Sequence, residues 1–258
     1  MVRQPGNAHG AIPCKREMWL RFGEATGRLS WASERTTSMT RHDYPATGAW
    51  DATQPVGSRR FAHFPSDRPF ALDGAVNLEG VTIAYETWGE LNSERSNAIL
   101  VCHAWTGDSH AAGPAEDGHP SPGWWEGIIG PGLAIDTERW FVVCSNVIGG
   151  CQGTTGPASP HPIDGKPYGS RFPVITVRDM VRAQLRLTDI LGIDVWHSVV
   201  GGSMGGMQVL EWAVMYPERV RTIVPIATCA QSTAQQIDRK STRLNSSHIP
   251  LSRMPSSA

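Results

Sequence analysis

The stretch Gly201-Gly202-Ser203-Met204-Gly205 decides the fold, because it fits the pattern G-x-S-x-G in a telling context. It follows a strand-like apolar run at residues 196–200 and precedes a helix-like run at residues 207–215. A serine on so tight a strand-to-helix turn has strained backbone angles, and glycine neighbours leave room for the turn and for a substrate. The helix that follows directs free N–H groups and the positive end of its dipole toward the serine. The pattern therefore predicts a nucleophile elbow with Ser203 at its tip; the alternative is a glycine-rich turn that holds a serine by chance.

Strand-like and helix-like runs alternate on both sides of this elbow. We expect strands at residues 81–88, 98–103, 140–144 and 220–227, and an amphipathic helix at residues 177–191. Such alternation is typical of a mostly parallel sheet with helices on both faces. Together with the elbow, it predicts the α/β class and, within it, the α/β-hydrolase fold.

Composition narrows the class of function. The 258 residues carry a formal net charge of −1, which favours neither nucleic acid nor an anionic membrane as a partner. No apolar run is long enough to span a bilayer, and the first twenty residues lack the apolar core of a secretory signal. Five cysteines, an odd number without paired spacing, do not form a disulfide framework. A reducing cytoplasm is the simplest compartment.

Three segments follow from the distribution of residues. Residues 1–75 are a polar extension that we expect to be partly disordered, either as a genuine leader or as sequence upstream of a start at Met39. Order is expected from about Val76, and residues 76–237 form the first part of the enzyme domain. Residues 238–258 are polar, lack periodicity and are expected to be a disordered, non-native tail.

The second oxyanion donor in this fold comes from the loop after an early strand, here residues 103–108. The donors would be the backbone N–H groups of Trp105 and Met204, and the indole of Trp105 is left free to pack or to line an acyl pocket. His103 is a candidate for the catalytic base. Its place at the end of a buried strand favours a structural role, because in this fold the base follows the nucleophile along the chain.

Several blocks, in order, resemble the homoserine O-acyltransferases. They are CHAWTGDSHAAG at 102–113, GWW at 123–125, GP at 130–131, CSNVIGGCQGTTGP at 144–157, GKPYG at 165–169, FP at 172–173, RDMVR at 178–182 and GGSMGGMQ at 201–208. Esterases share the elbow but not the block at 146–157. The similarity covers about residues 76–237.

The resemblance implies a two-step acyl transfer in methionine biosynthesis. Ser203 would take an acetyl group from acetyl-CoA, or a succinyl group from succinyl-CoA, and pass it to the hydroxyl of L-homoserine. It also implies a homodimer, no metal and no permanently bound cofactor. The loop at residues 149–156 shapes the acceptor pocket or is a tight structural turn, and we leave both open. Cys144 and Cys151 are interpreted as buried small residues rather than metal ligands.

One departure from the family pattern matters. The catalytic aspartate and histidine of the family lie beyond the nucleophile, after two more strands and a helical lid, whereas this chain has no Asp or Glu after Asp238 and only His248 beyond it. We therefore expect an incomplete α/β-hydrolase fold, a truncated fragment that is inactive as written. Other hypotheses are a serine O-acyltransferase, an esterase-type hydrolase, and a non-catalytic module that has shed its acid and base.

Overall fold

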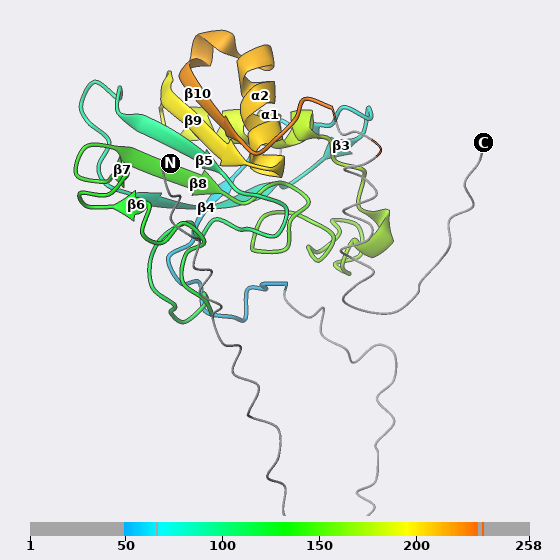
Figure 1. Ribbon diagram of the computed structural model, residues 1–258. Helices are drawn as coiled ribbons and strands as arrows, with labels where there is room; N and C mark the ends of the chain where they lie inside the picture. The colour runs from blue at the N-terminus through cyan, green and yellow to red at the C-terminus, as the bar shows by residue number, and fades with distance from the viewer. Residues whose placement is uncertain (1–48, 66, 232–233, 235–258) are drawn as a thin grey trace, which may run out of the picture. The chain divides into compact units, whose positions relative to one another are not determined.

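The computed structural model describes residues 49–65, 67–231 and 234, shown as coloured ribbon in Figure 1. These residues belong to the second of two units, which covers residues 45–258. The proposed start at Met39, the polar tail after Asp238 and His248 lie outside the described residues.

The described residues build a six-stranded sheet in the order β1-β4-β8-β5-β9-β10. Its strands are β1 (Arg60–His63), β4 (Thr82–Trp88), β5 (Ala98–Cys102), β8 (Phe141–Ser145), β9 (Trp196–Gly202) and β10 (Val220–Ile226). Strands β8, β5, β9 and β10 run parallel, whereas β1 and β4 join antiparallel at one side. The strands expected from the apolar runs are all present, within one or two residues at their ends.

The N-terminal boundary of order differs from our expectation. Strand β1 lies inside the stretch predicted to be a polar extension, yet it pairs with β4 from Arg60 opposite Tyr85 to His63 opposite Thr82. A second small sheet, β2 (Phe70–Ala71) with β3 (Asn77–Leu78), also starts before Val76. Single buried residues, such as Ala62 and Phe70, anchor these short strands, and so sparse an apolar pattern carries little sequence signal.

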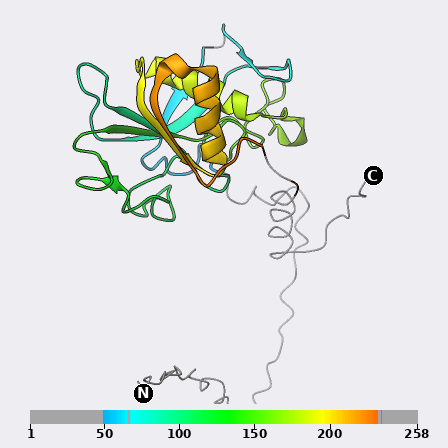
Figure 2. The same ribbon diagram turned by 45° about the horizontal axis from the view of Figure 1, so that its top comes forward.

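Both α-helices of the described residues cover the same face of the sheet (Figures 1 and 2). The helices α1 (Val177–Ile190) and α2 (Met204–Met215) pack on one another and on side chains such as Leu100 and Val199. The opposite face, with Ile99 and Val101, is covered by turns and the short strands β6 (Ile129–Gly130) and β7 (Ile135–Asp136). The expected helix on that second face is replaced, in the described residues, by this irregular segment between β5 and β8.

Helix α1 starts where the sequence supplies a cap. Thr176 accepts a hydrogen bond from the Asp179 N–H, and the Asp179 carboxylate accepts one from the Thr176 N–H, which completes a capping box. A buried amide contact then fixes the two helices together: Gln184 Nε2 donates to Gln208 Oε1 at 2.7 Å, and Trp212 Nε1 donates to Gln184 Oε1 at 2.8 Å. This contact orients α2, and with it the elbow at its N-terminus. The short 3₁₀ helices are η1 (Gly169–Arg171) and η2 (Pro217–Arg219).

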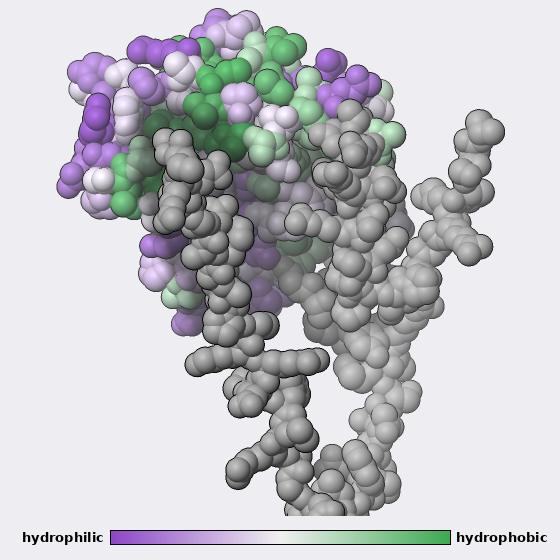
Figure 3. All heavy atoms as spheres, viewed as in Figure 1, coloured by the Kyte–Doolittle hydropathy of each residue, from purple (hydrophilic) through white to green (hydrophobic). Residues whose placement is uncertain are grey.

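Strand β10 is the outermost strand on its side of the described sheet, and its side chains are largely exposed. Ile223, Val224 and Ile226 are 37%, 43% and 42% exposed. Figure 3 shows hydrophobic side chains gathered at the top of the molecule, where Figure 1 draws β10 and α2. The described residues therefore present an apolar, open sheet edge.

Candidate active site

Ser203 occupies the strained turn that its sequence context predicts. It lies between the last residue of β9 and the first of α2, with φ of 55° and ψ of −118°. A non-glycine residue at positive φ costs free energy unless its surroundings hold it there. Two contacts do so: the Ser203 N–H donates to the Ile226 carbonyl at 3.0 Å, and Thr228 Oγ1 donates to the Ser203 carbonyl at 2.8 Å. Strand β10 and its C-terminal residues thus fix the elbow from the side.

Three glycines around Ser203, namely Gly201, Gly205 and Gly206, have no room for a side chain, whereas Gly202 does. A Cβ on Gly201 would lie 2.6 Å from the Gly205 carbonyl carbon, and one on Gly206 would lie 2.6 Å from the Thr228 side chain. A Cβ on Gly205 would overlap the carbonyl oxygen of Cys102, at the end of β5. The G-x-S-x-G pattern is therefore a packing requirement that presses α2 against the end of β5, where the loop 103–108 begins.

Both backbone groups predicted to form the oxyanion hole lie next to this junction. The Met204 N–H is at the first position of α2, where a helix has no intrahelical acceptor. The Trp105 N–H makes no hydrogen bond to any residue that the structure describes. The Trp105 side chain is 76% exposed, so within the described residues the indole does not pack. The arrangement suits donation by the Trp105 backbone rather than by its side chain.

His103 is a structural residue in this arrangement. It is buried; Nδ1 lies 2.7 Å from the Ala104 carbonyl, and Nε2 accepts from the Val147 N–H at 3.1 Å. These partners require the neutral tautomer with hydrogen on Nδ1. Burial lowers the pKa of His103 further. With both nitrogens engaged, His103 has no lone pair left for a serine proton.

Ser203 Oγ has no histidine or carboxylate hydrogen-bond partner within residues 49–65, 67–231 and 234. The described residues therefore hold the predicted nucleophile and the predicted oxyanion donors, but no histidine or carboxylate in contact with Ser203 Oγ to take its proton. His248, the one histidine that follows Ser203 in the sequence, lies outside them.

The hydroxyls of the loop at residues 149–156 are engaged in holding the fold. Thr154 Oγ1 accepts from the Ala84 N–H at 2.9 Å, and Thr155 Oγ1 accepts from the Thr82 N–H at 2.8 Å. A Cβ on Gly156 would overlap the Gly150 carbonyl oxygen. These contacts extend the pairing of β4 beyond the end of β8, which favours the structural interpretation of this loop.

Of the two cysteines predicted to be buried, one is buried and the other is exposed. Cys144 is buried, and burial holds the pKa of its thiol well above the ordinary value. Cys151 is exposed, so its interpretation as a buried residue was wrong. Neither is a member of the one group of three potential metal ligands among the described residues.

That group consists of Glu86, His110 and His119, all buried, with ligand atoms within 4.8 Å of one another. The imidazole rings stack at 3.9 Å with 12° between their planes, so their lone pairs run nearly parallel instead of converging on one ion. His110 Nδ1 lies 2.9 Å from Glu86 Oε2, and His119 Nε2 lies 3.3 Å from Glu86 Oε1. Burial raises the pKa of Glu86, and burial lowers the pKa of His119 to about 4. The geometry favours a hydrogen-bonded cluster over a metal centre.

Sequence reasoning missed Glu86. Its signal is a lone carboxylate in a strand whose other residues are buried or half-buried. Only the fold shows what that carboxylate faces: Ser109 and His110, just after the loop 103–108.

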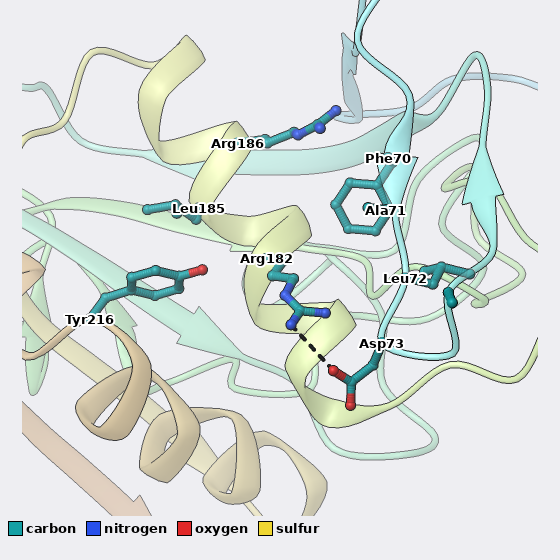
Figure 4. A pocket seen from close by; sticks show the side chains of 9 residues that line it. Phe70, Ala71, Leu72, Asp73, Arg182, Leu185, Arg186 and Tyr216 are labelled. Carbon is teal, nitrogen blue, oxygen red and sulfur yellow. Dashed lines mark hydrogen bonds and ion pairs between the residues drawn. The ribbon is translucent and has the colours of Figure 1, made fainter.

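One sizeable cavity of the described residues is not part of the candidate active site. A cavity of about 610 Å³ lies between β2 and α1, and Figure 4 shows Arg182 and Arg186 on its wall. Arg182 pairs with Asp73 at 3.2 Å, and Arg186 donates to the carbonyls of Arg68 and Pro69 at 3.0 Å. Ser203 does not line this cavity. Both arginines therefore serve the packing of β2 on α1.

None of the helices in the described residues combines the length and hydropathy that a membrane span requires.

Comparison with known proteins shows which family the chain belongs to. Residues 97–246 match the family model described as alpha/beta hydrolase fold. A homoserine O-acetyltransferase of Thermobifida fusca (strain YX) is 61% identical over 193 residues, which are 75% of this chain and 50% of the relative.

Two solved structures share the fold over about two thirds of the chain. Homoserine O-acetyltransferase from Bacillus anthracis has 38% identity and a TM-score of 0.62, covering 68% of this chain and 48% of its own. Esterase E22 has 40% identity and a TM-score of 0.63, covering 69% of this chain and 49% of its own. The chain spans about half the length of these relatives. With its elbow and parallel sheet, the chain belongs to the α/β-hydrolase fold family, and homoserine O-acetyltransferases are among its relatives there.

Proposed function

We propose that this chain carries the nucleophile part of a homoserine O-acetyltransferase. In the whole protein, Ser203 Oγ attacks the thioester carbonyl of acetyl-CoA, and its proton passes to a base beyond the described residues. The C–S bond breaks, CoA leaves as its thiol, and an acetyl-Ser203 ester remains. The hydroxyl of L-homoserine then attacks this ester, which releases O-acetyl-L-homoserine and restores Ser203.

The backbone of Ser203 is the observation that carries this proposal. A serine at φ of 55°, held by Ile226 and Thr228 between Gly201 and Gly205, which admit no Cβ, presents its hydroxyl at the N-terminus of a helix. The N–H groups of Met204 and Trp105 are the proposed donors to the oxyanion of each tetrahedral intermediate. The 61% identity to a homoserine O-acetyltransferase supports acetyl-CoA as donor and L-homoserine as acceptor.

The proposal also covers the co-substrate, the compartment and the oligomeric state of the enzyme. We expect acetyl-CoA as a co-substrate that leaves after each turnover, with succinyl-CoA as the competing donor. We also propose a cytoplasmic homodimer, on the family resemblance.

Homoserine-dependent release of CoA tests this function. The protein to assay joins this chain to the part of the Thermobifida fusca relative that the chain does not match. With acetyl-CoA, we expect CoA release that requires L-homoserine, and we expect Ser203→Ala to abolish it because the nucleophile is gone. Ser121→Ala, a change in an exposed serine, is the control and should leave the rate unchanged. Full activity in the Ser203→Ala protein would contradict the assignment.

An esterase is the second candidate, because esterase E22 matches the chain with 40% identity and a TM-score of 0.63. The two functions differ in what attacks the acetyl-Ser203 ester, water or a hydroxyl of an acceptor. Hydrolysis of a chromogenic acetate ester that L-homoserine neither accelerates nor diverts into an acetylated product would favour the esterase.

A further inference from the structure

A buried carboxylate stands behind the loop that carries one of the proposed oxyanion donors. Glu86 lies on β4, is 1% exposed and faces the residues that follow the loop 103–108. Its Oε1 accepts from Ser109 Oγ at 2.9 Å, and its Oε2 accepts from His110 Nδ1 at 2.9 Å. Burying a carboxylate is costly unless its oxygens are hydrogen-bonded, so this contact needs both partners in place.

The loop 103–108 is held at both of its ends. At its start, His103 Nε2 accepts from the Val147 N–H. At its end, the Ser109 N–H donates to Asn146 Oδ1 at 2.8 Å, beside the Glu86 contact. Between them, the Gly107 N–H donates to the Ala104 carbonyl at 2.9 Å and closes the turn that contains Trp105. The position of the Trp105 N–H therefore depends on two anchors, and Glu86 and Asn146 together supply the rear one, at Ser109.

The contacts of His110 determine which side chain could take the place of Glu86. Its Nε2 lies 3.2 Å from the Pro114 carbonyl, an acceptor, while its Nδ1 faces the Glu86 carboxylate, another acceptor. The ring of His110 therefore bridges the Glu86 carboxylate and the Pro114 carbonyl. A glutamine at 86 could keep both contacts of Glu86, since its oxygen can accept from Ser109 and its NH₂ can donate to His110 Nδ1. An apolar residue there would leave the Ser109 hydroxyl and His110 Nδ1 without the acceptor that Glu86 provides.

We propose that Glu86 is a positioning residue, which through Ser109 and His110 holds the Trp105 N–H where the oxyanion forms. This role rests on the proposed acyl transfer. A donor displaced by about 1 Å loses much of its effect on the transition state, with losses of about a hundredfold in rate.

Hydrogen exchange of the 258-residue chain tests the positioning without any assay of activity. Glu86→Leu removes both acceptors, Glu86→Gln keeps the shape and both contacts, and Glu126→Leu is the control. Glu126 also binds the segment after β5, through the Gly113 N–H at 2.7 Å, but outside the loop. We expect amides 103–110 to exchange roughly tenfold faster or more in Glu86→Leu. They should exchange at the unaltered rate in the other two variants, and those of α1 and β9 should be unchanged in all three. Unchanged exchange of residues 103–110 in Glu86→Leu would overturn the proposal. So would equal acceleration across α1 and β9, because Glu86 would then serve the whole fold.

Kinetics of the joined full-length protein provide the second readout. Glu86→Leu should lower kcat by about a hundredfold with an unchanged KM for acetyl-CoA, and Glu86→Gln should restore most of kcat. Adding Trp105→Pro to Glu86→Leu should lower kcat little further, because both changes remove the effect of the same donor, the Trp105 N–H. A raised KM at unchanged kcat would overturn the proposal. If the unaltered protein releases no CoA, the proposed function fails, and the exchange result still decides the role of Glu86.

Discussion

At the scale of single residues, the elbow shows how much of this site could be predicted. Ser203, its glycine neighbours and the flanking apolar runs indicate the strained turn from sequence, because only small residues fit there. The exposure of Trp105 was open, since a tryptophan in a loop can equally pack. Glu86 was not predicted at all. A single carboxylate in a strand has no periodic signature, and its partners, Ser109 and His110, lie more than twenty residues away along the chain.

Trp105 provides a test of backbone against side chain. Trp105→Leu should keep much of the CoA release of the full-length protein, because the exposed indole contacts little. Trp105→Pro removes the N–H donor and should lower kcat by about 10²–10³. Equal and severe losses from the two changes would show that the indole itself is needed.

His103 should make the stability of the 258-residue chain depend on pH. Burial lowers its pKa from the ordinary 6.5, so between the two values the unfolded chain binds a proton that the folded chain does not. Stability from this group is present above pH 6.5 and is lost as the pH falls. We expect the urea midpoint to drop between about pH 7 and pH 5, and to drop less in His103→Gln. An equal drop in both proteins would exclude His103 as the cause.

At the scale of elements, the parallel strands were predictable and the cover of the sheet was not. Continuous apolar runs indicate β5, β8 and β9 because both faces of these strands are buried. The face with Ile99 and Val101 is covered by the segment between β5 and β8. That segment is rich in turns, and its apolar residues have no helical period. The sequence therefore did not indicate that this segment, instead of a helix, covers that face.

The open edge at β10 gives an element-scale prediction. Val224→Lys places a charge on the edge strand and should raise the soluble monomer fraction of the 258-residue chain, measured by light scattering. Val214→Lys is the matched control, since Val214 is 71% exposed on α2, away from the edge, and should change the fraction little. The same gain from both would attribute the effect to charge rather than to the sheet edge.

At the scale of the whole molecule, the described residues hold one side of the proposed acyl-transfer site. They contain the proposed nucleophile, its strained backbone and the two proposed backbone donors, whereas no described histidine or carboxylate contacts Ser203 Oγ. The chain spans about half the length of its relatives, so the account is tested in the joined full-length protein.

The covalent intermediate is the most direct test of the central claim. The full-length protein is mixed with acetyl-CoA without acceptor, quenched in acid and digested, and the peptide that contains Ser203 is weighed by mass spectrometry. We expect one acetyl group on Ser203, and we expect L-homoserine, added before the quench, to remove it as O-acetyl-L-homoserine appears. Turnover without an acetylated Ser203 peptide at any time, or an acetyl group that accumulates on another residue and is discharged by L-homoserine, would contradict the account.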